Sequence, residues 1–263
     1  MDALKRILIA IIFIPLIIVV CYLGNYYLLG FLTIVSMLGL YELRKMFQIK
    51  EVSLPFIIIP LGGLSLWLMS LLDGIGIAYS LLLLFIIFAG YDVFTNRIDG
   101  AFNRLSHGLF AIFYQPYLYS LIYKTRLVDN GHLILVSIII MIWATDTFAY
   151  FLGMLIGKHR GVFQVSPKKS IEGFVAGLIF AFIAAFIIHY FYKDILPLNI
   201  LLLGAVSAGV FGQLGDLIES LFKRDVGVKD SSKIIPGHGG MLDRFDSLVL
   251  TVPVFYLLYH LFI

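Results

Sequence analysis

Long apolar segments are the feature that most constrains how this chain folds. Runs of about 17 to 25 apolar residues, long enough to cross a hydrocarbon core roughly 30 Å thick as helices, recur along nearly the whole sequence. Hydrocarbon contains no water to satisfy backbone amides, so such segments must be helical. The composition agrees, because 61% hydrophobic and 13% charged residues depart from the roughly 45–50% and 25% of soluble domains. We predict an all-α fold, a polytopic transmembrane helical bundle.

The apolar pattern predicts about nine spans. They cover residues 6–24, 26–41, 54–72, 74–91, 108–124, 131–152, 173–192, 196–215 and 247–263. The first resembles a signal peptide, since Lys5 and Arg6 precede an apolar core. No small-residue cleavage site follows, so we predict a retained anchor. The single cysteine, Cys21, lies in this segment, which leaves no disulfide and indicates a packing residue.

The basic residues lie in short loops and therefore report orientation. With the N-terminus in the cytoplasm, only Lys124, Arg126 and Lys193 fall outside, which leaves 16 of the 19 lysines and arginines inside. The count predicts nine spans with the C-terminus outside. It also accounts for the net charge of +3, so we expect no nucleic-acid partner. A segment missed near Lys124 and Arg126 would invert everything before it.

Residues 216–246 concentrate polar groups in an otherwise apolar chain. They include 11 charged residues. Asp216 follows an apolar span, where a carboxylate is costly unless it is partnered or faces a polar cavity. The basic residues interleaved with the acids suit a site that holds a metal ion and a polyphosphate together; they are Lys223, Arg224, Lys229 and Lys233. The alternatives are a solvated loop, or lysines that mark the cytoplasmic side or bind anionic lipid.

A glycine-rich turn, residues 236–240, precedes two aspartates of this stretch. Glycines let backbone amides approach a phosphate closely, and His238 could contact the phosphate or steady the turn. If Asp243 and Asp246 begin the last helix, their spacing puts both carboxylates on one face. There they could supply oxygen ligands to a hard cation such as Mg²⁺. Capping of the helix by the two acids is the alternative.

A second polar loop and one intramembrane acid complete the candidates. Ser166 followed by Pro167 is typical of a helix N-cap and first helical residue. With Lys168 and Lys169 beside it, this helix start is a candidate anion site, although an ordinary cap with topogenic lysines is the alternative. Asp146 lies within an apolar run, so we expect it to face the bundle interior or a polar cavity.

These motifs resemble the signature of the phosphatidate cytidylyltransferases, also called CDP-diacylglycerol synthases. The similarity rests on Ser220-Leu-Phe-Lys223-Arg224, Lys229-Asp230, Pro236-Gly-His-Gly-Gly240 and Asp243-Arg244-Phe-Asp246. Gly215-Asp216, residues 166–173 and Asp146 with residues 149–151 also resemble family blocks. Ser170 and Ile171 depart from it, because members often carry threonine and tryptophan there.

The resemblance implies Mg²⁺-dependent transfer of a cytidylyl group from CTP to phosphatidic acid, and leaves a second cation open. It also implies a homodimer. The count of basic residues places the N-terminus and the active site on the cytoplasmic side of the lipid bilayer, which we expect to be the cytoplasmic membrane. Residues 1–130 would then supply about five N-terminal spans. Residues 131–263 would form the catalytic region, with cytoplasmic loops 157–173 and 216–246.

Site roles follow from combining the resemblance with the charge pattern. The expected catalytic residues are Asp216, Asp243, Asp246, Lys229 and Arg244. The expected substrate-binding residues are Ser166, Lys168, Lys169, Ser220, Lys223, Arg224, His238, Gly239 and Gly240. The expected metal ligands are Asp216 and Asp243 first, then Asp246 and Asp146.

Two rival classes remain open. Another CTP-using membrane enzyme, such as a polyprenol or phytol kinase, would also need basic loops and metal-binding acids. A secondary transporter or channel would share the helices and buried charges, but transporter sites lie near the midplane. Most polar residues here lie at span ends, and Asp146 is the one that best fits a transporter.

Overall fold

The fold is a bundle of helices. A computed structural model describes residues 2–235 and 239–263 of the chain. Over these residues every named element is helical, and the only extended pairings are single bridges between Arg160 and Ser170 and between Ile235 and Gly239. The prediction of an all-α fold is confirmed.

The helices follow the apolar segments of the sequence. In chain order they are α1 (Asp2–Leu23), α2 (Asn25–Ile49), α3 (Ile58–Leu71), α4 (Asp73–Phe94), α5 (Ala101–Ile112), η1 (Phe113–Tyr117), α6 (Leu118–Leu127), α7 (Gly131–Ile156), α8 (Ile171–Tyr192), α9 (Leu198–Val206), η2 (Ser207–Gly212), α10 (Gln213–Asp225), α11 (Leu242–Phe245) and α12 (Leu248–Phe262). The π-helical turns η1 and η2 join α5 to α6 and α9 to α10, so residues 101–127 and 198–225 each form one continuous helical rod.

Several of these helices qualify as membrane spans. In the described part of the chain, five segments are long and apolar enough to cross a bilayer: Asn25–Ile49, Gly74–Phe94, Gly131–Ile156, Ile171–Tyr192 and Leu198–Asp225. Three further apolar helices are shorter, namely Phe13–Leu23, Ile58–Leu71 and Leu248–Phe262. A multi-pass membrane protein follows, whereas the predicted count of nine spans is not established by these lengths.

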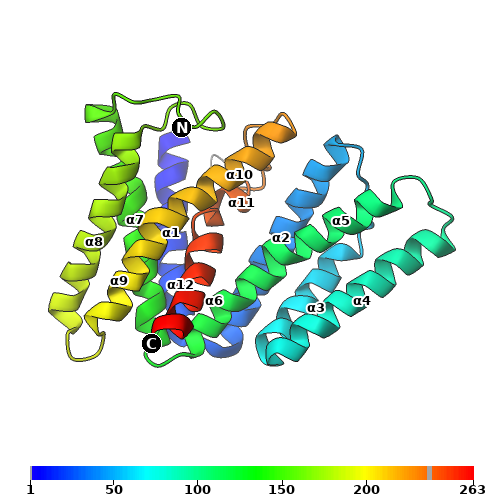
Figure 1. Cartoon of the computed structure of the whole chain (residues 1–263), viewed down its shortest axis with the longest axis horizontal. Coiled ribbons are helices and arrows are strands. Elements are labelled where there is room, and N and C mark those ends of the chain that lie inside the picture. The colour runs from blue at the N-terminus through cyan, green and yellow to red at the C-terminus, as the bar shows by residue number, and fades with distance from the viewer. Residues whose placement is uncertain (1, 236–238) are drawn as a thin grey trace.

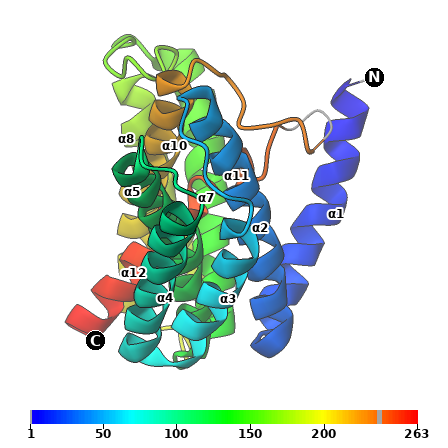
Figure 2. The ribbon, with the colours of Figure 1, turned by 90° about the vertical axis from the view of Figure 1, so that its right-hand side faces the viewer.

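The polar loops gather at one end of the bundle. The loop between α7 and α8, the end of α2, the connection from α4 to α5 and the end of α10 all lie at the top of Figure 1. The α1–α2, α3–α4 and α8–α9 connections lie at the opposite end, as does the C-terminus. Viewed from the side, α1 stands at the edge of the bundle (Figure 2). Cys21 packs there with 5% of its surface exposed, as predicted.

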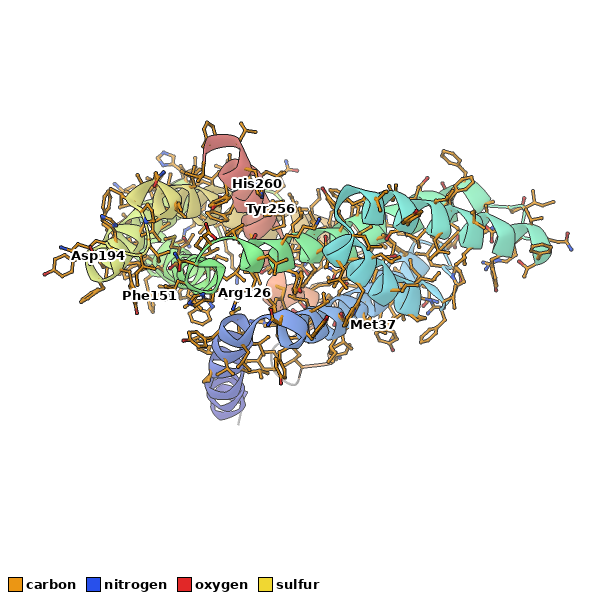
Figure 3. The ribbon with its side chains drawn as sticks, turned by 90° about the horizontal axis from the view of Figure 1, so that it is seen from below. Met37, Arg126, Phe151, Asp194, Tyr256 and His260 are labelled. Carbon is orange, nitrogen blue, oxygen red and sulfur yellow. The ribbon has the colours of Figure 1, made fainter. Side chains whose placement is uncertain are left out.

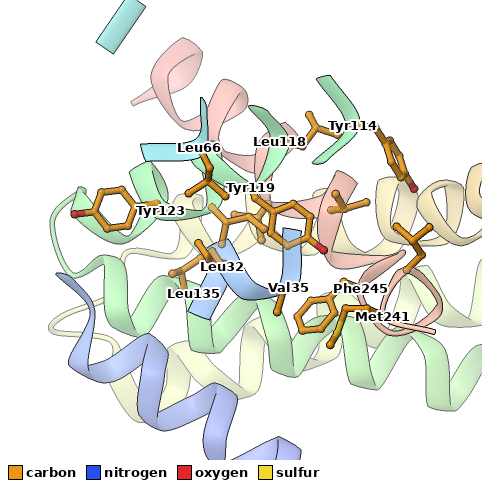
Figure 4. Close-up of a cluster of buried hydrophobic side chains, with 14 of the residues drawn as sticks. Leu32, Val35, Leu66, Tyr114, Leu118, Tyr119, Tyr123, Leu135, Met241 and Phe245 are labelled. Carbon is orange, nitrogen blue, oxygen red and sulfur yellow. The ribbon is translucent and has the colours of Figure 1, made fainter. Parts of the chain in front are cut away.

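A buried cluster ties residues 241–245 to the N-terminal helices (Figure 4). Leu32 of α2, Leu66 of α3 and Leu135 of α7 are all at most 1% exposed in this cluster. The ring of Phe245 lies 6.2 Å from that of Phe31 and 6.3 Å from that of Tyr119. The segment that follows the glycine-rich turn is therefore inserted into the core.

Candidate active site

The two polar loops singled out in the sequence lie side by side. Arg224, near the end of α10, donates to the carbonyl of Val165 in the first loop (3.4 Å) and to that of Val228 in the second (3.0 Å). Lys169 of the first loop pairs with Asp216 of α10, at 2.6 Å between Nζ and Oδ2. Segments 47 residues apart in the sequence are thus in direct contact.

A cavity of about 460 Å³ opens between α7, α8, α10 and the loop that joins α7 to α8. Its lining consists of Asp146, Ala149, Tyr150, Gly153, Met154, Arg160, Phe163, Lys168, Lys169, Ser170, Gly173, Phe174, Gln213 and Asp216. Asp146 therefore faces a cavity inside the bundle, one of the two positions expected for it. Two carboxylates and three basic side chains around a partly apolar hollow can hold a polyanion together with a cation.

Ser170 caps α8, and the prediction that Ser166 does so was wrong. Helix α8 begins at Ile171, and the Ser170 hydroxyl accepts from the amide of Gly173 at 3.1 Å. The Ser166 carbonyl instead accepts from the Lys169 amide in a turn (3.1 Å). The cap lies later because residues 166–169 form this turn, and Ser170, extended and bridged to Arg160, is the residue from which the helix starts.

Asp216 sits at the rim of the cavity, with 32% of its side chain exposed. One oxygen pairs with Lys169, and the other lies 3.4 Å from the hydroxyl of Ser220, one helical turn later. Lys168 is exposed and makes no ion pair with any other described residue. Because it also lines the cavity, Lys168 is placed to bind an anionic ligand there.

Asp243 is saturated by donors. Its Oδ1 accepts from Lys223 Nζ at 2.6 Å, and its Oδ2 accepts from the Ser231 amide (3.0 Å), the Ser231 hydroxyl (2.8 Å) and the Gly240 amide (2.8 Å). Burial raises the pKa of Asp243, but the hydrogen bonds from Lys223, Gly240 and Ser231 outweigh it and hold the pKa below its ordinary value. Lys223 also pairs with Glu219, a buried acid one turn earlier that the sequence reasoning missed.

Asp243 and Asp246 do not begin the last helix together, contrary to the prediction. Asp243 lies in the four-residue α11 and Asp246 follows it, before α12 begins at Leu248. Asp243 is drawn toward the donors of the loop, whereas Asp246 accepts from the Ser247 amide at 2.7 Å. Burial, then the nearby charges of Asp216, Glu219 and Asp146, raise the pKa of Asp246 well above its ordinary value.

Three consecutive amides at the end of the glycine-rich turn and just after it, those of residues 240–242, are occupied by carboxylates. Gly239 adopts a left-handed φ of 79°, and Gly240 donates to Asp243. The amides of Met241 and Leu242 donate to the two oxygens of Glu42 at 2.8 and 2.9 Å. The sequence had suggested that amides of this turn hold a phosphate, but these three are not free to do so. His238, with Pro236 and Gly237, lies outside the described residues.

The family assignment follows from comparison with known proteins. The model of the "Cytidylyltransferase family" matches residues 4–262. The chain belongs to this family. Proteins named phosphatidate cytidylyltransferase are similar over most of their length: that of Staphylococcus saprophyticus is 37% identical over 255 residues, covering 95% of each chain. That of Bacillus subtilis strain 168 is 36% identical over 233 residues, covering 85% of each.

The carboxylates of this cytidylyltransferase suit Mg²⁺ only in part. In the described ranges no group of three His, Cys, Asp or Glu side chains lies close enough to hold a metal ion. Mg²⁺ in nucleotide sites commonly uses one or two protein carboxylates and takes its other ligands from phosphates and water. Asp146 and Asp216, which line one cavity, fit that requirement. Asp243 does not, because both of its oxygens are engaged.

The remaining predicted site residues of the cytidylyltransferase are basic and exposed. Lys229 lies in the second loop and makes no ion pair with another described residue. Arg244 lies on α11 and is exposed as well. Glu42 is the residue the sequence reasoning missed altogether. Glu42 could have been found by the same feature as Asp216, because both are acids at the end of an apolar run.

Proposed function

We propose that the chain transfers CMP from CTP to phosphatidic acid, giving CDP-diacylglycerol and pyrophosphate for phospholipid biosynthesis. The observation that carries this proposal is the match, at 36–37% identity, to proteins named phosphatidate cytidylyltransferase along most of both chains. The cavity adds a physical basis, because charged groups for a polyphosphate gather at one end of apolar helices.

The reaction requires positioning more than proton transfer. An oxygen of the phosphatidate phosphate attacks the α-phosphorus of CTP; the new P–O bond forms as the bond to pyrophosphate breaks. The nucleophile is already anionic, so no strong general base is needed. Bringing two highly negative reactants together instead demands charge neutralisation and fixed geometry.

The side chains of the cavity divide this work. Asp146 and Asp216 would hold Mg²⁺, which when bound neutralises phosphate oxygens and polarises the α-phosphorus. Lys168 is placed to bind substrate phosphate, and Lys169 can exchange Asp216 for a phosphate oxygen. Arg224, Lys229 and Arg244 surround the second loop and are candidates for the other phosphate groups. Asp246, which was ranked after Asp216 as a metal ligand, is a further candidate to bind the Mg²⁺ ion.

We also propose nine spans, with the N-terminus and the site on the cytoplasmic side of the cell membrane. Support comes from the basic loops, which share one end of the bundle (Figure 1). CTP would reach that end from the cytosol, and phosphatidate would arrive by lateral diffusion with its acyl chains in the bilayer. Residues 131–263 would supply the cavity. A homodimer is proposed on the family resemblance alone.

A labelling experiment tests the function. The purified protein is incubated with phosphatidate, Mg²⁺ and CTP labelled either in the cytidine ring or at the γ-phosphate. We expect the cytidine label in the lipid, the γ-label in pyrophosphate, and neither when EDTA replaces Mg²⁺. Transfer of the γ-label to an added polyprenol or phytol would instead identify a lipid kinase, and no transfer of either label would refute the proposal.

A further inference from the structure

Glu42 connects the N-terminal helices to the loop that carries Asp243. It lies near the end of α2 and is 0% exposed. Its carboxylate accepts from the hydroxyls of Ser231 (2.9 Å) and Ser232 (2.6 Å) and from the amides of Met241 (2.8 Å) and Leu242 (2.9 Å). Both ends of the segment 231–242 are thus tied to one side chain.

Four donors take the place of a counterion around this buried charge; one of them, the Ser231 hydroxyl, shares its single hydrogen with Asp243. The ion pairs of Lys50, Arg104, Lys169 and Lys223 are all made with other acids. A buried carboxylate without such a partner persists only if hydrogen bonds satisfy it. The loop supplies the hydrogen bonds that satisfy Glu42, and Glu42 in turn fixes the loop.

The loop backbone at Gly240 packs tightly against the Glu42 carboxylate. A Cβ on Gly240 would collide with the Ser231 hydroxyl and with both oxygens of Glu42. The loop backbone thus approaches the carboxylate as closely as a glycine allows, and a small displacement of Glu42 must move the loop.

The same loop positions the charged groups of α10. The Ser231 hydroxyl touches Glu42 and also Asp243, at 2.8 Å from its Oδ2. Asp243 in turn holds Lys223. A continuous chain of contacts therefore runs from α2 to α10, the helix that carries Asp216 into the cavity.

We propose that Glu42 is a positioning residue of the enzyme: it holds the two ends of the segment 231–242, so that Asp243 and Lys223 keep α10 and its Asp216 aligned at the cavity. The proposal rests on the proposed function for its kinetic consequence and on geometry alone for the loop anchor. Glu42 itself touches no substrate, since its oxygens are enclosed by the four protein donors.

Glu42→Gln tests the proposal. The amide keeps the size of the side chain but turns one acceptor into a donor that faces a donor. We expect kcat to fall by about 10- to 100-fold, because small misalignments of reacting groups are costly. The KM values for CTP and phosphatidate should each stay within about twofold, since no substrate contact is removed. Glu51→Gln, an exposed acid shortly after the same helix, is the matched control and should leave both parameters unchanged.

Trypsin gives a second readout that needs no substrate. Lys229 and Lys233 flank the anchored serines and are exposed. In Glu42→Gln, cleavage after these two lysines should accelerate about tenfold, because local opening becomes easier. Cleavage after Lys158, in the other polar loop, should keep its wild-type rate and serves as the internal reference.

The outcomes separate the two proposals. Unchanged kcat and unchanged cleavage in Glu42→Gln overturn the positioning role, as does a raised KM at normal kcat, which would indicate substrate contact. If the wild-type protein makes no cytidine-bearing lipid, the proposed function fails while trypsin still decides the anchor. If Glu42→Gln does not fold, Ser232→Ala carries the test, since it removes one of the four hydrogen bonds: an intermediate, about threefold loss of kcat supports the role, and wild-type values refute it.

Discussion

At the scale of single residues, carboxylates that look equivalent in the sequence hold different positions. Asp216 faces the cavity with an exposed edge, whereas Asp243 is enclosed by Lys223, Ser231 and Gly240. Acids that bind a metal need free lone pairs, and acids that organise a loop need donors around them. The first description fits Asp216, and the second fits Asp243.

Asp243→Asn should reduce formation of CDP-diacylglycerol by at least about 100-fold. The change removes one of the two carboxylates that pair with the buried Lys223, so that Glu219 alone remains. It also weakens the hydrogen bonds that Asp243 accepts from Ser231 and Gly240, so the loop shifts out of position. The measurement is the labelled-CTP assay on membranes with matched protein levels. Asp225→Asn, which breaks only the exposed pair with Lys50, is the control and should stay near wild type. Full activity of Asp243→Asn would remove this residue from the site.

Lys168→Gln should raise the KM for one substrate by roughly five- to tenfold, with kcat nearly unchanged, because the side chain lines the cavity and contributes one charge to anion binding. Titration of CTP and of phosphatidate separately shows which substrate it contacts. Lys158→Gln lies in the same loop but outside the cavity lining and provides the comparison. If both KM values of Lys168→Gln match those of the Lys158 variant, the lysine has only a topogenic role.

At the scale of elements, polar side chains decide where helices end. Ser170 satisfies the first turn of α8. At the opposite end of the molecule, Arg126 donates to the carbonyls of Cys21 (2.8 Å) and Tyr22 (3.0 Å), the last turn of α1 (Figure 3). A cation at a helix C-terminus is favourable, which explains an arginine on the side predicted to be outside.

Ser170→Ala should destabilise the protein by about 1 kcal/mol, since it removes the side-chain acceptor of the α8 cap. In detergent this corresponds to a midpoint of thermal unfolding lower by about 2–4 °C. Ser166→Ala should have little effect, because the Ser166 carbonyl rather than its hydroxyl makes the turn. The reverse ranking of the two midpoints would restore Ser166 as the cap.

At the scale of the whole molecule, the connections alternate between two ends of the bundle. Residues 157–170 and the end of α10 lie at one end, and the α8–α9 connection lies at the other (Figure 1). No helix intervenes between α6, which ends at Leu127, and α7, which begins at Gly131. The loop that could have inverted the predicted orientation therefore contains no additional span.

Cysteine labelling in intact cells and inverted vesicles should reveal this sidedness. The only native cysteine, Cys21, is buried, so the wild-type protein should not react with a membrane-impermeant maleimide. Lys158→Cys should react only from the cytoplasmic side and Asp194→Cys only from outside (Figure 3). Labelling of both from the same side would rule out the proposed arrangement.

The sequence by itself determined the class of fold and indicated the end of the molecule at which charged groups gather. Apolar runs without charges can only be helices in hydrocarbon, and each predicted span lies on a helix of the structure. The density of charge in residues 216–246 marked the polar end of the molecule. Asp216 was identified because it follows an apolar span, and Lys169 because it lies in a polar loop beside an expected helix start.

Only the tertiary structure decided which charged groups meet. The hydrogen bonds of Glu42 join residues 189 to 200 positions apart, and no local spacing encodes such pairs. Asp243 and Asp246 have the spacing of a shared helix face, yet the donors around Asp243 come from α10 and the loop. Helix formation depends on neighbouring residues, whereas the partner of a buried charge depends on how the helices pack, and packing assigned Asp216 to the cavity and Asp243 to the loop.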